Sequence, residues 1–201
     1  MTQNYSLIIV DPQIDFISGS LAVNNAEEIF EPILSISNKF ENIFVTQDYH
    51  PKEHISFAST HNVELFSTIE LPYGKQVMWP DHCVQGTKGV EFDDSINQIK
   101  NKTIIKKGLQ KDLESYSGFH LTELKESLTK KNIEKIFVCG LATDFCVKKT
   151  AMDGVKEGFQ VYVLLDCSRG VAEKTVNEAI EEMKNKGITF INTTELDEHL
   201  N

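Results

Sequence analysis

The histidines and one neighbouring aspartate suggest a metal site. Four of the six histidines fall between positions 50 and 82, and they are His50, His54, His61 and His82. Asp48 and His50 follow a predicted strand, and residues two apart in an extended chain point the same way. With His82 they would provide two imidazoles and one carboxylate, which leave coordination positions open, as catalytic metal sites do. The spacing also suits ordinary polar loop residues, and the D-x-H pattern alone does not decide between the two.

A thiol, an acid and a lysine follow three other predicted strands. Cys146 comes where a strand gives way to a helix, and the unpaired amides of a helix start favour a thiolate and can bind an oxyanion. Asp11, near the apolar Phe16, would have a raised pKa and could shuttle protons. Asp11 also suits a turn, and Cys146 also suits a small buried hydrophobe. The spacing does not choose between Lys106 and Lys107.

The elements that must position these residues follow from apolar periodicity. Short runs rich in Ile and Val predict strands buried on both faces, at 7–10, 43–45, 104–105, 136–139, 161–165 and 188–191. Apolar residues at helical spacing predict helices between them, at 29–40, 121–128, 147–155 and 176–183. This alternation predicts one α/β domain over residues 1–201, with three α/β/α layers, Rossmann-type topology and a central, mostly parallel six-stranded sheet. An excursion at about 48–92 breaks the rhythm, and such excursions are usually functional.

The expected topology gathers the reactive residues in one place. Asp11, Asp48 with His50, Lys107 and Cys146 each follow a different one of the first four predicted strands. In open parallel sheets, ligands bind in the crevice outside the carboxyl ends of the strands. An acid, a lysine and a thiol beside a metal would make a site for nucleophilic attack on a carbonyl.

Composition excludes several classes of protein. The chain has 201 residues and a net charge of -10 without a basic stripe, which argues against nucleic-acid binding. The longest apolar stretch, Val161–Leu165, is too short to span a membrane. No positive charge precedes the first apolar run, and none of the four cysteines forms a C-x-x-C pair, so we expect a cytoplasmic protein with free thiols. Cys83, Cys139 and Cys167 are predicted to be buried thiols without a chemical role.

From Val10 to about Val171 the sequence resembles the nicotinamidase (pyrazinamidase) family of isochorismatase-like cysteine hydrolases. The matching motifs are VDPQIDF at 10–16, TQDYHPKEHISF at 46–57, WPDHCVQGT at 79–87, KKG at 106–108, SYSGF at 115–119 and GLATDFCV at 140–147. Several dispersed motifs in the same order are far more specific than any one of them. The resemblance implies an isochorismatase-like fold for the whole chain.

The resemblance also implies roles for individual residues. Its acid, lysine and nucleophile fall on Asp11, Lys107 and Cys146, because the lysine of the family directly precedes a glycine. Its metal ligands fall on Asp48, His50 and His82, with His54 as an additional ligand or a supporting residue and Glu64 as a weaker candidate. Its aromatic walls fall on Phe16, Trp79 and Tyr116, and it implies a cis peptide between Leu141 and Ala142. We expect the strand-to-helix turn to aim the amides of Ala142 and Cys146 at one point as an oxyanion hole.

The activity implied is that of an amidohydrolase acting on linear amides, which converts nicotinamide to nicotinate and ammonia in NAD salvage. A cysteine thioester would be the intermediate, and one divalent metal, zinc first and otherwise iron or manganese, would hold the pyridine nitrogen. Pyrazinamide would be a second substrate. Phe145 and Glu114 depart from the family pattern, away from the catalytic set, and leave the preference for ring substituents open.

Two other functions compete with this one. An amidohydrolase of the same superfamily could act on a carbamoyl or ureido substrate, but such relatives generally lack the D-x-H and WPDHC pair. Isochorismatases that cleave vinyl ethers do without the cysteine. A non-catalytic binding domain of the same fold would have no need of the intact acid, lysine, thiol and metal ligands. A small molecule is the expected partner, and the sequence leaves open whether the chain forms a homo-oligomer.

Overall fold

The computed structural model describes residues 3–200, and its centre is one six-stranded sheet. The strands are β1 (Tyr5–Val10), β2 (Ile43–Asp48), β5 (Lys102–Lys107), β6 (Lys135–Leu141), β7 (Gln160–Arg169) and β8 (Thr189–Ile191). They lie in the order β5-β2-β1-β6-β7-β8, and every neighbouring pair is parallel. The six predicted strands are therefore confirmed, in the strand order of a Rossmann-type sheet.

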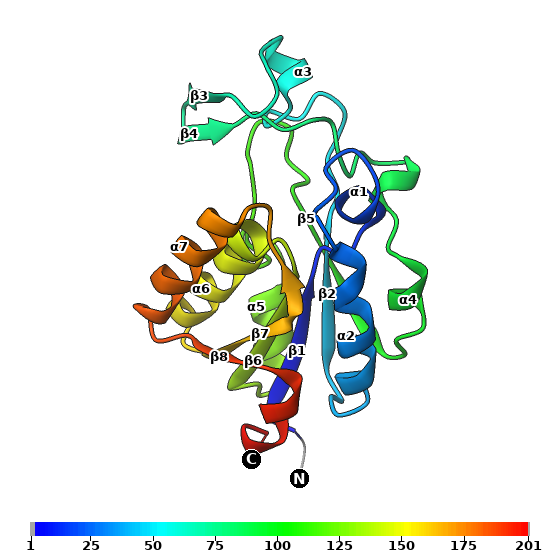
Figure 1. The fold of residues 1–201 in the computed structure, drawn as a ribbon, viewed down its shortest axis with the longest axis vertical. Helices are drawn as coiled ribbons and strands as arrows, with labels where there is room; N and C mark the ends of the chain where they lie inside the picture. Colours follow the sequence, from blue (N-terminus) through cyan, green and yellow to red (C-terminus); the bar gives the residue numbers. More distant parts are fainter. Residues whose placement is uncertain (1–2, 201) are drawn as a thin grey trace.

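Helices cover both faces of this sheet, which gives the predicted three layers (Figure 1). Along β1, Leu7 and Ile9 pack on one side and Ile8 and Val10 on the other. One face is covered by α2 (Phe30–Ser37), α4 (Asp94–Asn97), η1 (Ala26–Ile29) and η4 (Thr193–Glu198). The other is covered by α5 (Leu124–Lys130), α6 (Lys148–Lys156) and α7 (Glu173–Lys184). Burial on both faces explains why the strands are continuously apolar.

One predicted helix begins later than expected. The apolar spacing predicts a helix over 121–128, but α5 begins at Leu124. Leu121 has a left-handed backbone with φ of 56° and an exposed side chain, so it lies in the preceding turn. The helices predicted at 29–40, 147–155 and 176–183 are present as α2, α6 and α7, each with shifted ends.

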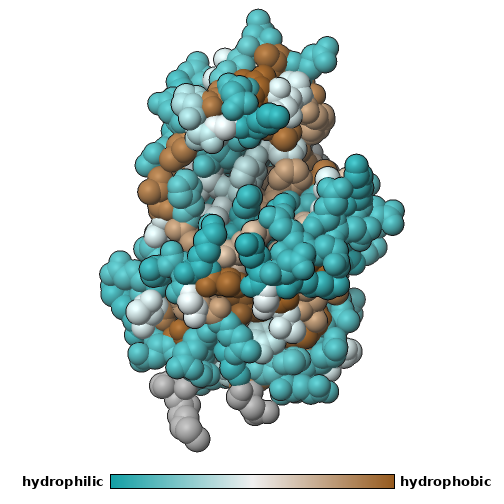
Figure 2. All heavy atoms as spheres, turned by 90° about the vertical axis from the view of Figure 1, so that its left-hand side faces the viewer, coloured by the Kyte–Doolittle hydropathy of each residue, from teal (hydrophilic) through white to brown (hydrophobic). Residues whose placement is uncertain are grey.

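The excursion at about 48–92 lies beyond the carboxyl ends of the strands (Figure 1). It holds the short helix α3 (Ala58–His61), the hairpin β3 (Thr68–Leu71) and β4 (Gly74–Val77), and the turn η2 (Lys88–Val90). The hairpin was not predicted, because its strands are short and half polar. Figure 2 shows hydrophobic side chains near this end of the molecule, and the exposed ones before the hairpin include Val63, Leu65 and Phe66. Between residues 3 and 200, no helix is long and apolar enough to cross a membrane.

Candidate active site

Four strand ends bring one lysine, two carboxylates and one thiol together. The Lys107 Nζ atom lies 2.9 Å from Asp11 Oδ2, 2.6 Å from Asp48 Oδ1 and 3.5 Å from Cys146 Sγ. All four side chains are buried. Lys106 points elsewhere, with its Nζ 3.8 Å from the centre of the Tyr49 ring. The convergence expected at the carboxyl ends of the strands is therefore present, and the lysine in it is Lys107.

Local backbone geometry allows this crowding. Asp11 leaves β1 with a left-handed φ of 47°, and its carboxylate accepts a hydrogen bond from the Thr46 hydroxyl at 2.5 Å. The Asp11 amide donates in turn to the Thr46 oxygen at 3.1 Å. Gly140 near the end of β6 has φ of 113°, and a Cβ there would lie 2.2 Å from the Val10 carbonyl oxygen. Only glycine lets β6 approach β1 closely enough to bring the Cys146 turn against Asp11.

Burial sets the protonation states of the acid and the thiol. Burial and the nearby Asp48 raise the pKa of Asp11 to about 6, although Lys107 opposes the shift. Burial raises the pKa of Cys146 as well; Lys107 opposes this shift, and Asp11 and Asp48 add to it. The helix start was expected to favour a thiolate, but desolvation outweighs its effect. The resting thiol is thus protonated, and a carboxylate with a pKa near neutrality faces it.

Cys146 lies in a turn of π-helix, η3 (Thr143–Val147), directly after β6. The peptide between Leu141 and Ala142 is cis, as predicted. The Ala142 carbonyl accepts hydrogen bonds from the amides of Phe145 and Val147, which closes the turn at the start of α6. Ala142 and Cys146 line the same pocket. Helix starts of this kind hold backbone donors that can face a developing negative charge.

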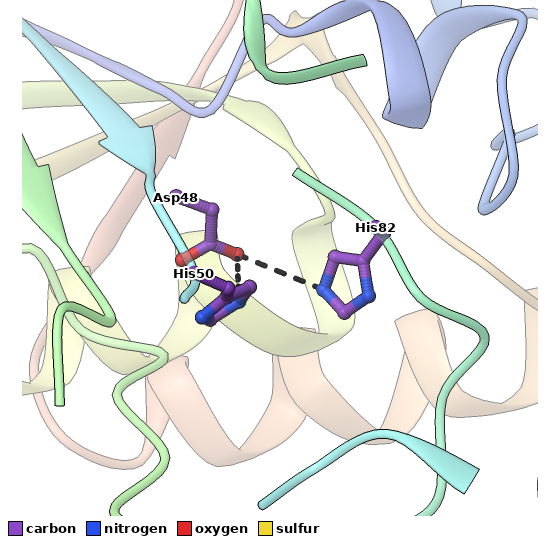
Figure 3. Close-up of side chains that lie close together, drawn as sticks. All are labelled: Asp48, His50 and His82. Carbon is purple, nitrogen blue, oxygen red and sulfur yellow. Dashed lines mark ion pairs between the residues drawn. The ribbon is translucent and has the colours of Figure 1, made fainter. Parts of the chain in front are cut away.

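Asp48, His50 and His82 form a cluster with the chemistry of a metal site (Figure 3). Asp48 Oδ2 lies 3.5 Å from His50 Nε2 and 4.0 Å from His82 Nε2. The two Nδ1 atoms face backbone carbonyls, that of Gly108 at 3.0 Å and that of Pro80 at 2.8 Å. Such contacts fix the tautomer in which Nε2 carries the lone pair. The buried His50 Nε2 has no hydrogen-bond partner among residues 3–200, so the donor set fits a divalent metal.

Electrostatics in this cluster favour the ligand protonation states of Asp48 and His82. At His50, burial would lower the pKa of the imidazole, but the neighbouring Asp48 outweighs it and raises that pKa. Burial alone would raise the pKa of Asp48, but Lys107 and His50 together hold it well below its usual range. Burial lowers the pKa of His82 to about 4, with His50 acting in the same direction. A charged carboxylate and a neutral imidazole are the forms that bind metals.

The two further ligand candidates lie outside the cluster. His54 Nδ1 faces the Ser56 hydroxyl at 2.8 Å and Nε2 faces the Leu113 carbonyl at 3.2 Å, so both ring nitrogens are engaged. Its ring packs against that of His50 with 4.1 Å between centres. His54 therefore packs against the candidate ligand His50, and neither of its own ring nitrogens is free to bind a metal. Glu64 is exposed in the excursion and is not part of the converging group.

An aromatic pocket adjoins both clusters. Its lining includes the three predicted wall residues, Phe16, Trp79 and Tyr116, together with Cys146, Asp48 and His82. The Trp79 indole donates to the Tyr116 hydroxyl at 2.9 Å, which ties two walls together. Phe145 and Glu114 line the same pocket, and Phe145 contacts the Trp79 ring edge-on at 5.0 Å. These are the two residues that depart from the family pattern, and they share the pocket with Cys146.

Two polar residues that the sequence argument missed also contact the site. Thr46 hydrogen-bonds Asp11, and Gln13 hydrogen-bonds the backbone of Asp48. A signal existed for Thr46, because it lies two residues before Asp48 in β2 and such neighbours share a face of an extended chain. Spacing gave no signal for Gln13, because the chain turns at the left-handed Asp11 before it.

The fold agrees with comparisons to known proteins. The isochorismatase domain model matches residues 5–195, so the chain belongs to the isochorismatase family. The nicotinamidase of Acinetobacter baylyi is 40% identical, over 94% of this chain and 93% of that protein. The solved nicotinamidase/pyrazinamidase of Acinetobacter baumanii has a TM-score of 0.92 and 41% identity, over 96% of this chain and 98% of that one. The pyrazinamidase of Pyrococcus horikoshii, solved with zinc, has a TM-score of 0.79 and 35% identity, over 94% and 99%.

Proposed function

We propose that this protein is a nicotinamidase, an amidohydrolase that converts nicotinamide to nicotinate and ammonia. The observation that carries the proposal is the contact of one buried lysine, Lys107, with Asp11, Asp48 and Cys146 beside an aromatic pocket. That arrangement supplies a nucleophile, a base and an orienting cation for an acyl transfer. Relatives that match nearly the whole chain and are named nicotinamidases support the same activity.

Cys146 is the nucleophile and Asp11 the base. The buried thiol passes its proton to the Asp11 carboxylate as Sγ attacks the carboxamide carbon, and the carbonyl π electrons move to oxygen. A base with a pKa of about 6 is ionised at neutral pH yet basic enough to take the proton. Lys107 remains charged, because Asp11 and Asp48 outweigh the effect of burial on its pKa.

The backbone amides of Ala142 and Cys146 bind the oxyanion that this attack creates. The oxyanion then collapses, the C–N bond breaks, and Asp11 returns its proton to the departing nitrogen as ammonia. The acyl group stays on Cys146 as a thioester. Asp11 next takes a proton from water as the water oxygen attacks the thioester carbon. The C–S bond breaks, Asp11 returns its proton to the sulfur, and nicotinic acid leaves, losing its own proton to solvent to become nicotinate.

Asp48, His50 and His82 would hold one divalent metal ion, zinc in our proposal, although iron or manganese suits the same ligands. When bound, the metal supplies an open coordination position for the pyridine nitrogen. Phe16, Trp79 and Tyr116 flank the ring faces, so the carboxamide reaches Cys146 in one orientation. We assign the reaction to NAD salvage in the cytoplasm. Pyrazinamide would be a second substrate, because it also carries a ring nitrogen meta to its carboxamide.

The test is ammonia release by the purified, metal-loaded protein. Nicotinamide should be turned over far faster than an N-carbamoyl amino acid of similar size. The opposite preference would assign the protein to the carbamoyl-hydrolysing class. Tight binding of nicotinamide without release of ammonia would show a binding domain instead of an enzyme.

A further inference from the structure

Two side chains of the turn after β1, Gln13 and Asp15, hydrogen-bond to the backbone of the segments that carry Asp48 and His82. This turn begins at Asp11 and includes the short helix α1 (Ile14–Ile17). Gln13 is fully buried, and its Nε2 donates to the carbonyl of Asp48 at 2.8 Å and to that of Val90 at 3.0 Å. Its Oε1 accepts from the Asp48 amide at 2.8 Å. One side chain therefore satisfies both backbone groups of Asp48 and fixes the residue in place.

Asp15 holds the other side of the cluster in the same way. Its Oδ2 accepts a hydrogen bond from the Cys83 amide at 2.7 Å, directly after His82. Cys83 has a left-handed φ of 48°, which an L residue adopts only when its surroundings hold it there. The Asp15 Oδ1 atom accepts from the Ser20 amide at 3.2 Å, which anchors the carboxylate to its own turn.

The packing around Asp15 leaves its carboxylate little freedom. A Cβ at Gly89 would lie 2.0 Å from Asp15 Oδ2, and a Cβ at Gly19 would lie 2.3 Å from Oδ1. Two chain segments thus come against the carboxylate as closely as glycine allows. The acceptor that holds Cys83 is therefore set by packing as well as by hydrogen bonds.

We propose that Gln13 and Asp15 are positioning residues that set the separation of Asp48 and His82, and thereby the affinity of the site for its metal. The inference rests on the metal site proposed above. Neither side chain is a metal ligand, and both act through the backbone of a ligand or of its neighbour. Groups that orient ligands in this way typically change metal affinity by about 10- to 100-fold when removed.

The chain offers matched controls for both residues. Gln3 bridges backbone as Gln13 does, donating to the Lys39 carbonyl at 3.1 Å and accepting from the Glu41 amide at 2.8 Å, but at the opposite end of the sheet. Asp166 accepts from the Thr193 amide at 3.0 Å, as Asp15 accepts from Cys83. Neither control residue contacts a member of the metal cluster.

The experiment measures Zn²⁺ binding without any substrate. Metal-free protein is titrated in competition with a chromogenic chelator, for the unaltered chain, Gln13→Met, Asp15→Asn, Gln3→Met and Asp166→Asn. Thermal unfolding of each metal-free protein is recorded alongside. We expect Zn²⁺ affinity to fall by about 10- to 100-fold in Gln13→Met and Asp15→Asn and to stay unchanged in the two controls. Absorption of the Co²⁺-loaded forms should change in the first pair only.

Unchanged Zn²⁺ affinity in folded Asp15→Asn and Gln13→Met would overturn the inference, even if their thermal transitions fell, because a purely structural role predicts that result. Should Gln13→Met fail to fold, the nearly isosteric Asp15→Asn carries the test alone. If the unaltered chain binds no Zn²⁺, the proposed metal site itself is wrong and this inference falls with it. Equal affinities in a chain that does bind Zn²⁺ would overturn only the positioning role.

Discussion

The Asp48 carboxylate connects Lys107, and with it the catalytic group around Cys146, to the metal cluster of His50 and His82. Asp48 Oδ1 accepts from Lys107 Nζ at 2.6 Å, while Asp48 Oδ2 faces His50 and His82. Lys107 in turn lies against Asp11 and Cys146. A change of charge in the metal cluster therefore reaches the thiol through one intervening side chain, so metal binding and thiol activation should not be independent.

Replacing the thiol should stop the reaction. Cys146→Ala should lower kcat by about 10⁴-fold or more, because Cys146 is the one thiol among the described residues that line the pocket. The circular dichroism spectrum and Zn²⁺ binding should stay as in the unaltered protein. Cys139→Ala is the matched control, since Cys139 is a buried free thiol inside β6. Retention of substantial activity in Cys146→Ala would rule out the thioester route.

The pH dependence of kcat/KM should report on Asp11. Burial raises the pKa of its carboxyl to about 6, and the ionised form is the active base. Activity should therefore rise with pH through about 6 to a plateau and be lost as pH falls below it. The raised pKa of Cys146 adds no second rise near neutrality, because Asp11 removes that proton during attack. A profile that is flat between pH 5 and pH 7 would contradict the assignment of Asp11 as base.

Thr46→Val should move this profile in a known direction. The Thr46 hydroxyl donates to Asp11 Oδ1 at 2.5 Å and so stabilises the carboxylate. Without that bond, the apparent pKa in kcat/KM should rise by about one to two units, since hydrogen bonds to charged groups contribute about 1.5–3 kcal/mol. Activity at high pH should largely recover. A fall in activity without any shift of the profile would mean that Thr46 serves packing alone.

Benzamide tests the metal's proposed role as an anchor for the ring nitrogen. It lacks that nitrogen, so its kcat/KM on the metal-loaded protein should be about 100-fold below that of nicotinamide. His50→Ala removes one of the three ligands and should narrow the gap between the two substrates. Equal turnover of both amides by the loaded protein would show that the metal does not select the substrate.

Much of the fold could be predicted because strands buried on both faces leave a clear apolar signal. Leu7–Val10 and Ile43–Val45 lie within β1 and β2 as expected. The hairpin β3–β4 could not be predicted, since its strands are short and pair with each other, and every second residue of β3 is exposed. Leu121 matched the helical period, but it belongs to the turn before α5. Periodicity does not say where a helix begins.

The positions of site residues that directly follow strands could be predicted from the sequence. The positions of site residues that lie in loops could not. The topology placed Asp11 and Cys146 beyond the carboxyl ends of the neighbouring strands β1 and β6, and the family resemblance selected Lys107 over Lys106. The position of Phe145 and Glu114 in the pocket depends on how η3 and the loop after β5 turn, which spacing does not determine. The protonation of Cys146 was also missed, because desolvation depends on packing that no local motif reveals.

The neighbouring positions of β1 and β6 have a consequence for biosynthesis. Val10, beside the proposed base, pairs with Gly140, which precedes the proposed nucleophile by six residues. A nascent chain released from the ribosome up to the end of β5 already carries the base, the lysine and all three metal ligands, but no Cys146. One edge of β1 then lacks its partner strand β6 until more than a hundred further residues after Val10 have been translated. With Cys146 as the proposed nucleophile, hydrolysis cannot begin before β6 and the turn after it have been synthesised. Of the neighbouring strands in the sheet, β1 and β6 are the farthest apart in sequence.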